Sequence, residues 1–412
     1  MEYITMSKKE YNSISIFEKL KNGEILQKSA AKQLGLTSRQ VRNKYKRYIS
    51  EGPKGLVHLT RGKASKRRLE EDLVNKIVEL ITSNYSDFGP TFAAEILEKN
   101  HGIKANKETL RKIMITGGIW KPKKRKRKQR VRRERRECFG ELVQFDGSIH
   151  DWLENRGPNC TLLLYIDDAT STILWAKFCS GESTKNVMEV SKEYFERYGR
   201  PVSVYTDHGS VYKVNVGNKD GDKLTQFGRA LKELDIELIH ANSPEAKGRV
   251  ERCFGTLQDR LIKELRLEGI NNIADANRYL QTIFIPKHNK KRSVPPKCKD
   301  NLHKDIKGFN LDYSLCIREK RTLANDYTIQ YKTRIFQLAL QQKAVIRPKE
   351  IITVREHLNG QISLWIRGHN LNFYEIEKRV KTIKKAQHKY NKPAKNHPWK
   401  RGHKTITPCR VK

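Results

Sequence analysis

The sequence predicts a multidomain protein with N-terminal all-α modules, a central α/β core and a small C-terminal all-β barrel. Three observations support this prediction. Apolar residues recur at helical spacing in the first 120 residues, β-rich runs alternate with helical runs over 138–290, and short strands separated by turn residues occupy 315–376. The chain has 412 residues, which is enough for about two to four domains.

The net charge favours a nucleic-acid partner. Lys and Arg number 84 and Asp and Glu 46, so the formal net charge is +38, and a field this positive attracts polyanions. No apolar run reaches the roughly 18–20 residues of a membrane helix, and the N-terminus lacks the apolar core of a signal peptide. The seven cysteines form no CxxC pair, so we expect neither a disulfide framework nor a zinc module, and a reducing, cytosolic compartment.

Residues 1–60 are expected to form a helix-turn-helix DNA-binding domain. Ala30 and Ala31 suit a close approach of two helices, Gly35 suits the turn, and Thr37 or Ser38 can accept the free N–H groups that begin the next helix. The alternative is an ordinary helical hairpin with a solvated basic face. The side chains of the second helix that suit base edges and phosphates are Arg39, Gln40, Arg42, Asn43, Lys44 and Lys46.

Residues 61–120 are expected to form a second helical DNA-binding domain. Its first run has helical apolar spacing, as at Leu73 and Ile77, and two further helical runs follow. The last run resembles a recognition helix, and its side chains available to DNA are Thr109, Arg111 and Lys112.

A basic linker follows at 121–137, with the sequence KPKKRKRKQRVRRERR at 121–136. Such a block cannot bury a core, and a phosphate backbone is its best partner because binding releases counterions. The alternative is a solvated linker. The cations expected to contact DNA are Lys123, Lys124, Arg125, Lys126, Arg127, Lys128, Arg130, Arg132 and Arg133.

The region 138–290 reads as three strands, a helix, a strand, a helix, a strand and a long helix. This order predicts an α/β sheet whose opening hairpins are antiparallel. Beyond it, runs such as RIFQLAL, KAVIRP and IITVREHL predict the small β-barrel of 315–376, with turns such as Asn359-Gly360. A basic tail occupies 377–412.

Three acidic residues lie at element boundaries of the α/β region. Asp146 falls in VQFDGS, Asp207 ends PVSVYTD, and Glu251 begins the long helix. Phosphodiester cleavage needs an attacking oxygen, a stabilised leaving oxygen and neutralised phosphate charge, which two Mg²⁺ ions about 3.5–4 Å apart supply. Mg²⁺ prefers oxygen ligands. We therefore expect these acids to be catalytic and to bind two Mg²⁺ ions, with Mn²⁺ able to substitute. Any one of them alone could equally be a cap or turn residue.

Several segments of the chain resemble those of a known family. They are DGSIHDW at 146–152, Arg156-Gly157-Pro158, LLLYIDDA at 162–169, TDHGSVY at 206–212, and the spacing of Pro244, Gly248 and Glu251. On these residues the chain resembles the DDE transposases and integrases, which have a retroviral-integrase-like, ribonuclease-H-like core, and among them the ISNCY type of bacterial insertion-sequence transposase. The resemblance covers most of the chain.

The resemblance implies that Asp146, Asp207 and Glu251 are the catalytic triad of a transposase that binds insertion-element ends and catalyses metal-dependent strand cleavage and strand transfer, the reactions of DNA integration and recombination. It implies double-stranded DNA partners, namely element ends and target DNA, and a homo-oligomer assembled on DNA, without a membrane partner. The expected location is the bacterial cytoplasm, in association with the nucleoid. Two alternatives stay open: a non-catalytic repressor with a decayed core, and a nuclease of the same fold.

Other residues near the motifs leave alternatives. The resemblance gives Asp167 and Asp168 a structural or supporting role, and Glu251 is preferred to Glu245, which precedes the predicted helix. Trp152 could stack on an extruded base, but packing in the core is preferred. His150, His208 and His240 could relay protons but are better read as hydrogen-bonding loop residues.

The chain also departs from the family pattern. The segment 214–223 lengthens the spacing between the second and third acids and is expected to be a surface loop. Related enzymes carry a Lys or Arg two helical turns after the Glu, where this chain has Gln258. The neighbouring cations Arg252 and Arg260 are therefore the expected DNA contacts.

Overall fold

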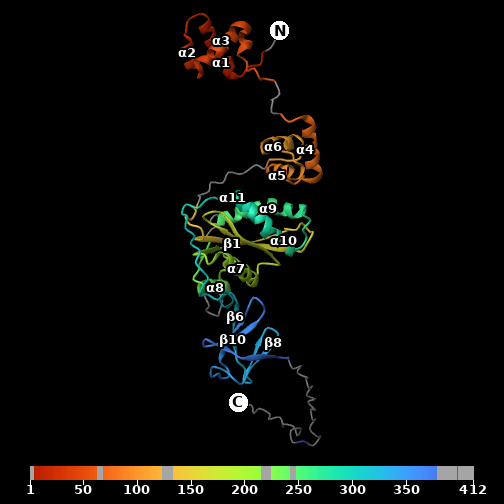
Figure 1. The fold of residues 1–412 in the computed structure, drawn as a ribbon, viewed down its shortest axis with the longest axis vertical. Coiled ribbons are helices and arrows are strands. Elements are labelled where there is room, and N and C mark those ends of the chain that lie inside the picture. Colours follow the sequence, from red (N-terminus) through yellow and green to blue (C-terminus); the bar gives the residue numbers. More distant parts are fainter. Residues whose placement is uncertain are drawn as a thin grey trace, which may run out of the picture. The chain divides into compact units, whose positions relative to one another are not determined.

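The computed structural model describes residues 4–62, 68–122, 133–214, 224–241, 247–377 and 397. The chain divides into two compact units, 1–126 and 127–412, which Figure 1 shows as ribbons. Most cations expected in the basic linker, the predicted loop at 214–223 beyond its first residue, Pro244 and Glu245, and nearly all of the basic tail lie outside the described residues. The linker cations concerned are Lys123, Lys124, Arg125, Lys126, Arg127, Lys128, Arg130 and Arg132.

The first unit begins with a cluster of short helices around Phe17, Val41 and Leu56, which are fully buried. Gly35 adopts the left-handed conformation at φ 62° between two of these helices. Thr37 then caps the next helix, because its hydroxyl accepts the backbone N–H of Gln40, whose side chain accepts the N–H of Thr37 in return. The helices are α1 (Lys8–Lys21), α2 (Gln27–Leu34), α3 (Ser38–Glu51) and the 3₁₀ turn η1 (Gly52–Leu56).

The three helices predicted after residue 61 are present. They pack around a cluster of their own that includes Ile77, Ile81, Phe92 and Leu110, which confirms the helical apolar spacing that the sequence shows. Their bounds are α4 (Glu71–Asn84), α5 (Pro90–His101) and α6 (Lys107–Thr116).

The second unit is built on a five-stranded mixed sheet in the order β3-β2-β1-β4-β5. The first three strands pair antiparallel, and the last two run parallel to β1. This arrangement confirms the predicted α/β core with antiparallel opening hairpins. The strands are β1 (Leu142–His150), β2 (Cys160–Asp167), β3 (Ile173–Cys179), β4 (Ser203–Thr206) and β5 (Glu237–His240).

Helices cover both faces of this sheet. Figure 1 shows α9, α10 and α11 on one side of the sheet and α7 and α8 on the other. On β2, Leu162 and Leu164 pack in the cluster that contains residues of α9 and α10, whereas Leu163 and Tyr165 pack in the cluster that contains residues of α7 and α8. Because both faces are covered, every residue of β2 is buried. The helices are α7 (Thr184–Tyr198), α8 (Gln226–Glu233), α9 (Gly248–Leu267), α10 (Ile273–Tyr279), the π-helical turn η3 (Leu280–Phe284), α11 (Ile285–Arg292) and α12 (Leu311–Ser314).

The C-terminal β-region differs in part from the predicted barrel. Its strands form a four-stranded sheet, β11-β10-β9-β6, and a three-stranded sheet, β12-β8-β7. Both sheets contribute to one buried cluster, but among the described residues they do not close into a barrel. The strands are β6 (Ile317–Thr322), β7 (Thr328–Tyr331), β8 (Arg334–Leu338), β9 (Ile351–Glu356), β10 (Ile362–Ile366), β11 (His369–Leu371) and β12 (Phe373–Ile376).

The predicted strand KAVIRP at 343–348 is wrong, because this segment pairs with no strand of the described chain. Ala344 and Ile346 still pack on the cluster of the β-region. Pro348 has no N–H to donate, and Lys349 has a positive φ of 70°, so the chain turns here. In the part of the chain that the structure describes, no helix is both long and apolar enough to span a bilayer.

Candidate active site

Two of the predicted acids lie side by side on the sheet. Asp146 lies in β1, and Asp207 directly follows β4, the parallel neighbour of β1. The β1–β4 register pairs Gln144 with Tyr205. Two residues further along each strand, the same register places Asp146 beside Asp207. The two carboxylates come together because parallel strands deliver residues in register to the same edge of a sheet.

A lysine ammonium lies between these carboxylates. The Nζ of Lys247 is 2.8 Å from Oδ1 of Asp146 and 3.9 Å from Oδ2 of Asp207. The Lys247 side chain is only 7% exposed, although it stands at the start of α9. A buried ammonium needs a negative partner, and this pair of carboxylates provides it. The acid pair therefore already binds a cation that belongs to the chain itself.

Backbone groups and burial set the chemistry of the acid pair. Asp146 Oδ1 accepts the N–H of Gly147 at 3.1 Å, and Asp207 Oδ1 accepts the N–H of Gly209 at 2.8 Å. Burial raises the pKa of Asp146 above its ordinary value, the Lys247 ammonium opposes this rise, and the Asp207 charge adds to it. Desolvation makes the ionised form of Asp146 costly, and a nearby cation stabilises that form.

Glu251 stands in the first turn of α9, one residue after Val250, and its side chain is exposed. Among the residues that the structure describes, no three His, Cys, Asp or Glu side chains are grouped as ligands for one metal ion. The structure thus brings Asp146 and Asp207 together and leaves Glu251 at the start of the adjoining helix.

A further acid, Glu182, lies near the pair formed by Asp146 and Asp207. Tyr212, which is buried, donates its hydroxyl to Oε1 of Glu182. The other oxygen, Oε2, lies over Gly147, where an added Cβ would come within 2.5 Å of it. Burial raises the pKa of Glu182, the Tyr212 hydrogen bond opposes this, and the charges of Asp146 and Asp207 add to it. Glu182 therefore belongs to the electrostatic environment of the acid pair.

Sequence reasoning missed both Lys247 and Glu182. A signal for Glu182 was available: β3 runs in the same direction as β1, so residues that follow β3 reach the edge of the sheet where the acids lie. Lys247 lies inside the motif that runs from Pro244 to Glu251. Nothing in the spacing of this lysine within the motif indicates an ion pair with Asp146.

Of the three histidines near the motifs, His208 and His240 make polar contacts, and His150 and His240 end strands β1 and β5 rather than lying in loops as predicted. His208 Nδ1 lies 2.9 Å from Nζ of Lys213, and His240 Nδ1 lies 3.4 Å from the backbone oxygen of Asp207. Burial lowers the pKa of His240. His150, by contrast, is exposed at the end of β1, with its ring 5.7 Å from that of Trp152.

Two structural interpretations are confirmed. Trp152 is fully buried, packs on Phe178 with ring centroids 5.6 Å apart, and donates its Nε1–H to the carbonyl of Ser148. Asp167 is also fully buried and accepts N–H groups from Gly140 and Thr170. Trp152 is therefore a core residue, and Asp167 holds the turn that follows β2.

The side chains expected to read DNA in the first unit lie mostly on its surface. In α3 the exposed members are Arg39, Gln40, Arg42, Asn43 and Lys46, and Lys44 is half-buried. In α6, Thr109 and Lys112 are exposed, whereas Arg111 is half-buried, pairs with Glu108 at 3.1 Å and lies over the ring of Trp120. Arg111 therefore already has partners within its own unit.

Three cations expected to contact DNA in the second unit have different surroundings. Arg252 is exposed on α9. Arg260 is buried on the same helix, so in this structure its side chain is not presented at the surface. Arg133 forms an ion pair with the buried carboxylate of Asp168, and this contact occupies the guanidinium that was expected to bind phosphate.

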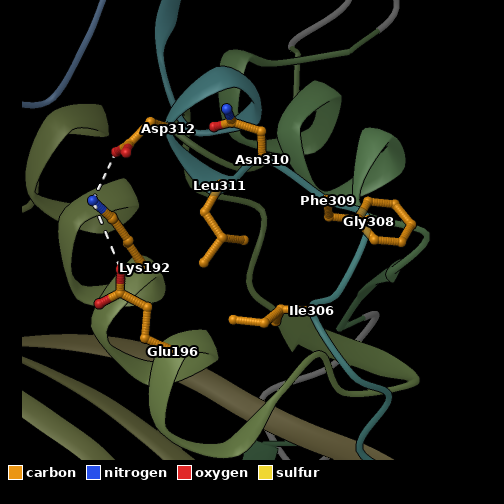
Figure 2. A pocket seen from close by; sticks show the side chains of 8 residues that line it. All are labelled: Lys192, Glu196, Ile306, Gly308, Phe309, Asn310, Leu311 and Asp312. Atoms are coloured by element: carbon orange, nitrogen blue, oxygen red, sulfur yellow. Dashed lines mark hydrogen bonds and ion pairs between the residues drawn. The ribbon is translucent and has the colours of Figure 1, made fainter.

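A separate open pocket of about 480 Å³ lies between α7 and residues 306–312. Figure 2 shows Lys192 between Glu196 and Asp312, with Leu311 and Ile306 beside them among the residues that line the pocket. The Lys192–Asp312 contact is 2.7 Å and the Lys192–Glu196 contact 3.7 Å. None of the predicted catalytic residues lines this pocket, so the chemistry of the acid pair lies elsewhere.

Two known proteins are similar to the chain over nearly its whole length. Transposase y4bF of Sinorhizobium fredii (strain NBRC 101917 / NGR234) is 37% identical over 383 residues, which cover 92% of this chain and 83% of that protein. The transposase for insertion sequence IS1202 of Streptococcus pneumoniae is 28% identical over 440 residues, which cover 93% and 92%. No protein-family profile matches the chain.

Retroviral proteins are among the solved structures with some likeness to the chain. A chain of the simian T-cell lymphotropic virus intasome in complex with PP2A regulatory subunit B56 gamma is 16% identical at a TM-score of 0.33, covering 68% of this chain and 88% of its own. The HTLV-2 integrase catalytic core domain in complex with magnesium, in its dimeric form, is 17% identical at a TM-score of 0.25, covering 35% and 89%. With scores this low, family membership rests on the two transposase sequences.

Proposed function

Since this chain belongs to the transposases of insertion sequences, the family of its two sequence relatives, we propose that it binds the ends of a mobile DNA element and catalyses metal-dependent strand cleavage and strand transfer. Asp146, Asp207 and Glu251 are the proposed catalytic acids. The partners are double-stranded DNA, as element ends and as target, and further copies of the chain assembled on that DNA.

The observation that carries the proposal is the convergence of Asp146 and Asp207 on one cation. Their oxygens lie 2.8 Å and 3.9 Å from the Lys247 ammonium. A pair of carboxylates that holds a monovalent ammonium also suits a divalent ion, because the donor set consists of hard oxygens. These residues therefore fit Mg²⁺, and Mn²⁺ as a substitute.

When bound, a pair of Mg²⁺ ions would polarise the phosphate and stabilise the attacking and leaving oxygens. The chain's own residues do the rest. Asp146 and Asp207 would hold and orient the cations, while Glu251, on the adjoining helix, would supply a further carboxylate. Lys247, once released from the acid pair, would be free to contact the DNA phosphate, which a lysine binds as a point charge.

DNA binding is proposed for the first unit and is supported by its exposed polar side chains and by the net charge of +38. Residues such as Arg39 and Arg42 are exposed on α3, a helix that follows a tight turn and is capped by Thr37. The capped helix presents these side chains in a fixed orientation, as recognition of base edges requires.

The test removes one carboxylate at a time from the full chain. Asp146→Asn, Asp207→Asn and Glu251→Gln each keep the shape of the side chain and remove its charge. The substrates are labelled duplexes copied from the flanks of the gene that encodes the chain. We expect Mg²⁺-dependent release of a 3′-hydroxyl to fall by at least about 100-fold, beyond the 10–100-fold typical of residues that only orient a ligand.

The matched control is Glu196→Gln, which removes one exposed carboxylate on α7 away from the acid pair. This variant should cleave like the wild type, and all four variants should shift the same DNA in a gel. Cleavage without joining by the wild type would indicate a nuclease instead, and specific binding without any cleavage would indicate a repressor. Full activity in one acid variant would remove that residue from the site.

A further inference from the structure

Among the residues that the structure describes, no side chain of the chain's own N-cap closes the start of α9. Lys247 occupies the N-cap position but gives no side-chain hydrogen bond to the helix. The first backbone N–H groups of any helix have no partner within that helix, and the first turn of α9 lies against the sheet. The partner of the Val250 N–H comes from another element: Oε1 of Gln144, on β1, accepts it at 3.1 Å.

Gln144 is fully buried, and both ends of its amide are used. Its Nε2 donates to Oδ1 of Asp168 at 2.7 Å, while its Oε1 accepts from Val250. The side chain therefore spans from the end of β2, through β1, to the first turn of α9. It lies two residues before Asp146 on β1, and its helical partner lies one residue before Glu251.

The Asp168 carboxylate binds several groups besides the Gln144 amide. Its carboxylate is fully buried and also accepts Nη1–H of Arg249 at 2.8 Å and the backbone N–H of Arg136 at 2.9 Å, besides its ion pair with Arg133. Arg249 belongs to the same first turn as Val250. Two neighbouring residues of α9 are thus bound by this pair of side chains. Arg249 binds Asp168 through its guanidinium, and Val250 binds Gln144 through its backbone N–H.

We propose that Gln144 and Asp168 are positioning residues that fix the first turn of α9 on β1 and thereby set the place of Glu251 relative to Asp146. The inference rests on the proposed function, in which both acids serve one reaction. A buried amide bonded at both ends has one orientation available, so the spacing between strand and helix has little freedom. Neither residue need touch metal or DNA to have this effect.

The first test replaces Gln144 by Met, which keeps the volume and removes both hydrogen bonds. Asp168→Asn is the more direct change, but it leaves two arginines without their buried counter-charge and risks unfolding the chain. The structural control is Ser191→Ala, which breaks the buried hydrogen bond between Ser191 and Tyr165 on the other face of the sheet. Hydrogen exchange of the full-length protein, without metal or DNA, is measured by mass spectrometry. Gln144→Met should speed exchange in the peptide that contains 248–254, and Ser191→Ala should not.

The second test separates positioning from stability by the choice of metal. Mg²⁺ demands near-ideal octahedral geometry, so a displaced carboxylate should harm reactions with Mg²⁺ more than those with the more tolerant Mn²⁺. For Gln144→Met we expect the Mg²⁺-supported cleavage rate to fall by about 10–100-fold, as for other residues that orient metal ligands. The Mn²⁺-supported rate should fall several-fold less. Ser191→Ala should leave the ratio of the two rates at the wild-type value.

The possible results distinguish the positioning role of Gln144 and Asp168 from the proposed function. Equal losses with both metals, or a 248–254 peptide that exchanges as in the wild type, would overturn the positioning role and leave the proposed function standing. A wild-type chain that shows no divalent-dependent cleavage at all would overturn the proposed function, and the inference with it.

Discussion

The Nζ of Lys247 lies 2.8 Å from Oδ1 of Asp146. Asp146 and Asp207 would repel each other without a cation between them, and the ammonium offsets this repulsion. A divalent ion that binds the same oxygens must compete with Lys247 for them. The lysine therefore stabilises the acid pair when metal is absent and opposes metal binding when metal is present.

The first prediction concerns this competition. Lys247→Met should lower the free energy of unfolding without metal by about 1.5–3 kcal/mol, since hydrogen bonds to charged groups contribute about that much. Mg²⁺ should then stabilise the variant more than it stabilises the wild type. Melting temperatures with and without Mg²⁺ measure both effects. Lys192→Met, at the rim of the separate pocket, is the control. Equal Mg²⁺ shifts in the wild type and Lys247→Met would show that the ammonium does not occupy the cation position.

The second prediction concerns the contact between Gly147 and Glu182. An added Cβ at Gly147 would lie 2.5 Å from Oε2 of Glu182, so Gly147→Ala should displace that carboxylate without altering any charge. We expect cleavage to fall by about 10-fold or more, as for groups that support a metal ligand, and Glu182→Gln to act in the same direction. Gly255→Ala on α9, where an added Cβ meets nothing within 4 Å, is the control. Wild-type cleavage by both Gly147→Ala and Glu182→Gln would exclude Glu182 from the site.

The third prediction concerns DNA reading by α3. Arg39→Ala and Arg42→Ala should weaken binding to the flanking duplexes, because both side chains are exposed on the proposed recognition helix. Each lost phosphate contact should reduce the slope of log K against log salt by about 0.9. Fluorescence anisotropy at several salt concentrations measures this slope. Lys9→Ala, exposed on α1, is the control, and equal effects of all three changes would show that α3 has no special part in binding.

The fourth prediction concerns pH. Burial lowers the pKa of His303 from 6.5 to about 4, and its ring is bonded to Tyr194 and Asn301. Between pH 6.5 and about pH 4, His303 binds a proton in the unfolded chain but not in the folded chain. The contribution of the neutral His303 to the free energy of unfolding is therefore fully present above about pH 6.5. It is lost as the pH falls toward about 4.

His303→Gln provides the comparison. The wild type should exceed this variant in free energy of unfolding at pH 7, and the difference should shrink by pH 4.5, as measured by urea denaturation at each pH. His288, whose pKa burial also lowers to about 4, should make the wild type and the variant lose stability equally over the same range, so its contribution cancels in their difference. A constant difference between wild type and His303→Gln would contradict the assignment.

Much of the fold followed from local patterns. The strand and helix order of the core, and the cap at Thr37, depend on side chains within a few residues of one another, which periodicity and capping chemistry capture. The adjacency of Asp146 and Asp207 also follows, once each is placed on neighbouring parallel strands. Strand β6, with the sequence IREKRT, was missed because it has little apolar alternation and gains its place by pairing with β9.

The parts of the site that sequence reasoning missed depend on long-range contacts. Arg260 was expected to contact DNA but is buried, and Lys247, which the sequence analysis did not single out, is paired with Asp146. Arg133 belongs by composition to the basic segment, but Asp168 binds it. A single Lys or Arg can face solvent, bind a phosphate or pair with a carboxylate far along the chain. The sequence does not distinguish these partners, because a positively charged side chain suits all three.

The close contact of Gly147 with Glu182 also has an evolutionary consequence. Any side chain at 147 would compete for the volume that the carboxylate of Glu182 fills. A lineage that acquires a larger residue at 147 should therefore also carry a shorter residue at 182, and one that keeps Glu182 should keep glycine. Among homologous transposases these two positions are expected to covary, and a comparison of many such sequences could detect the dependence without any experiment on this chain.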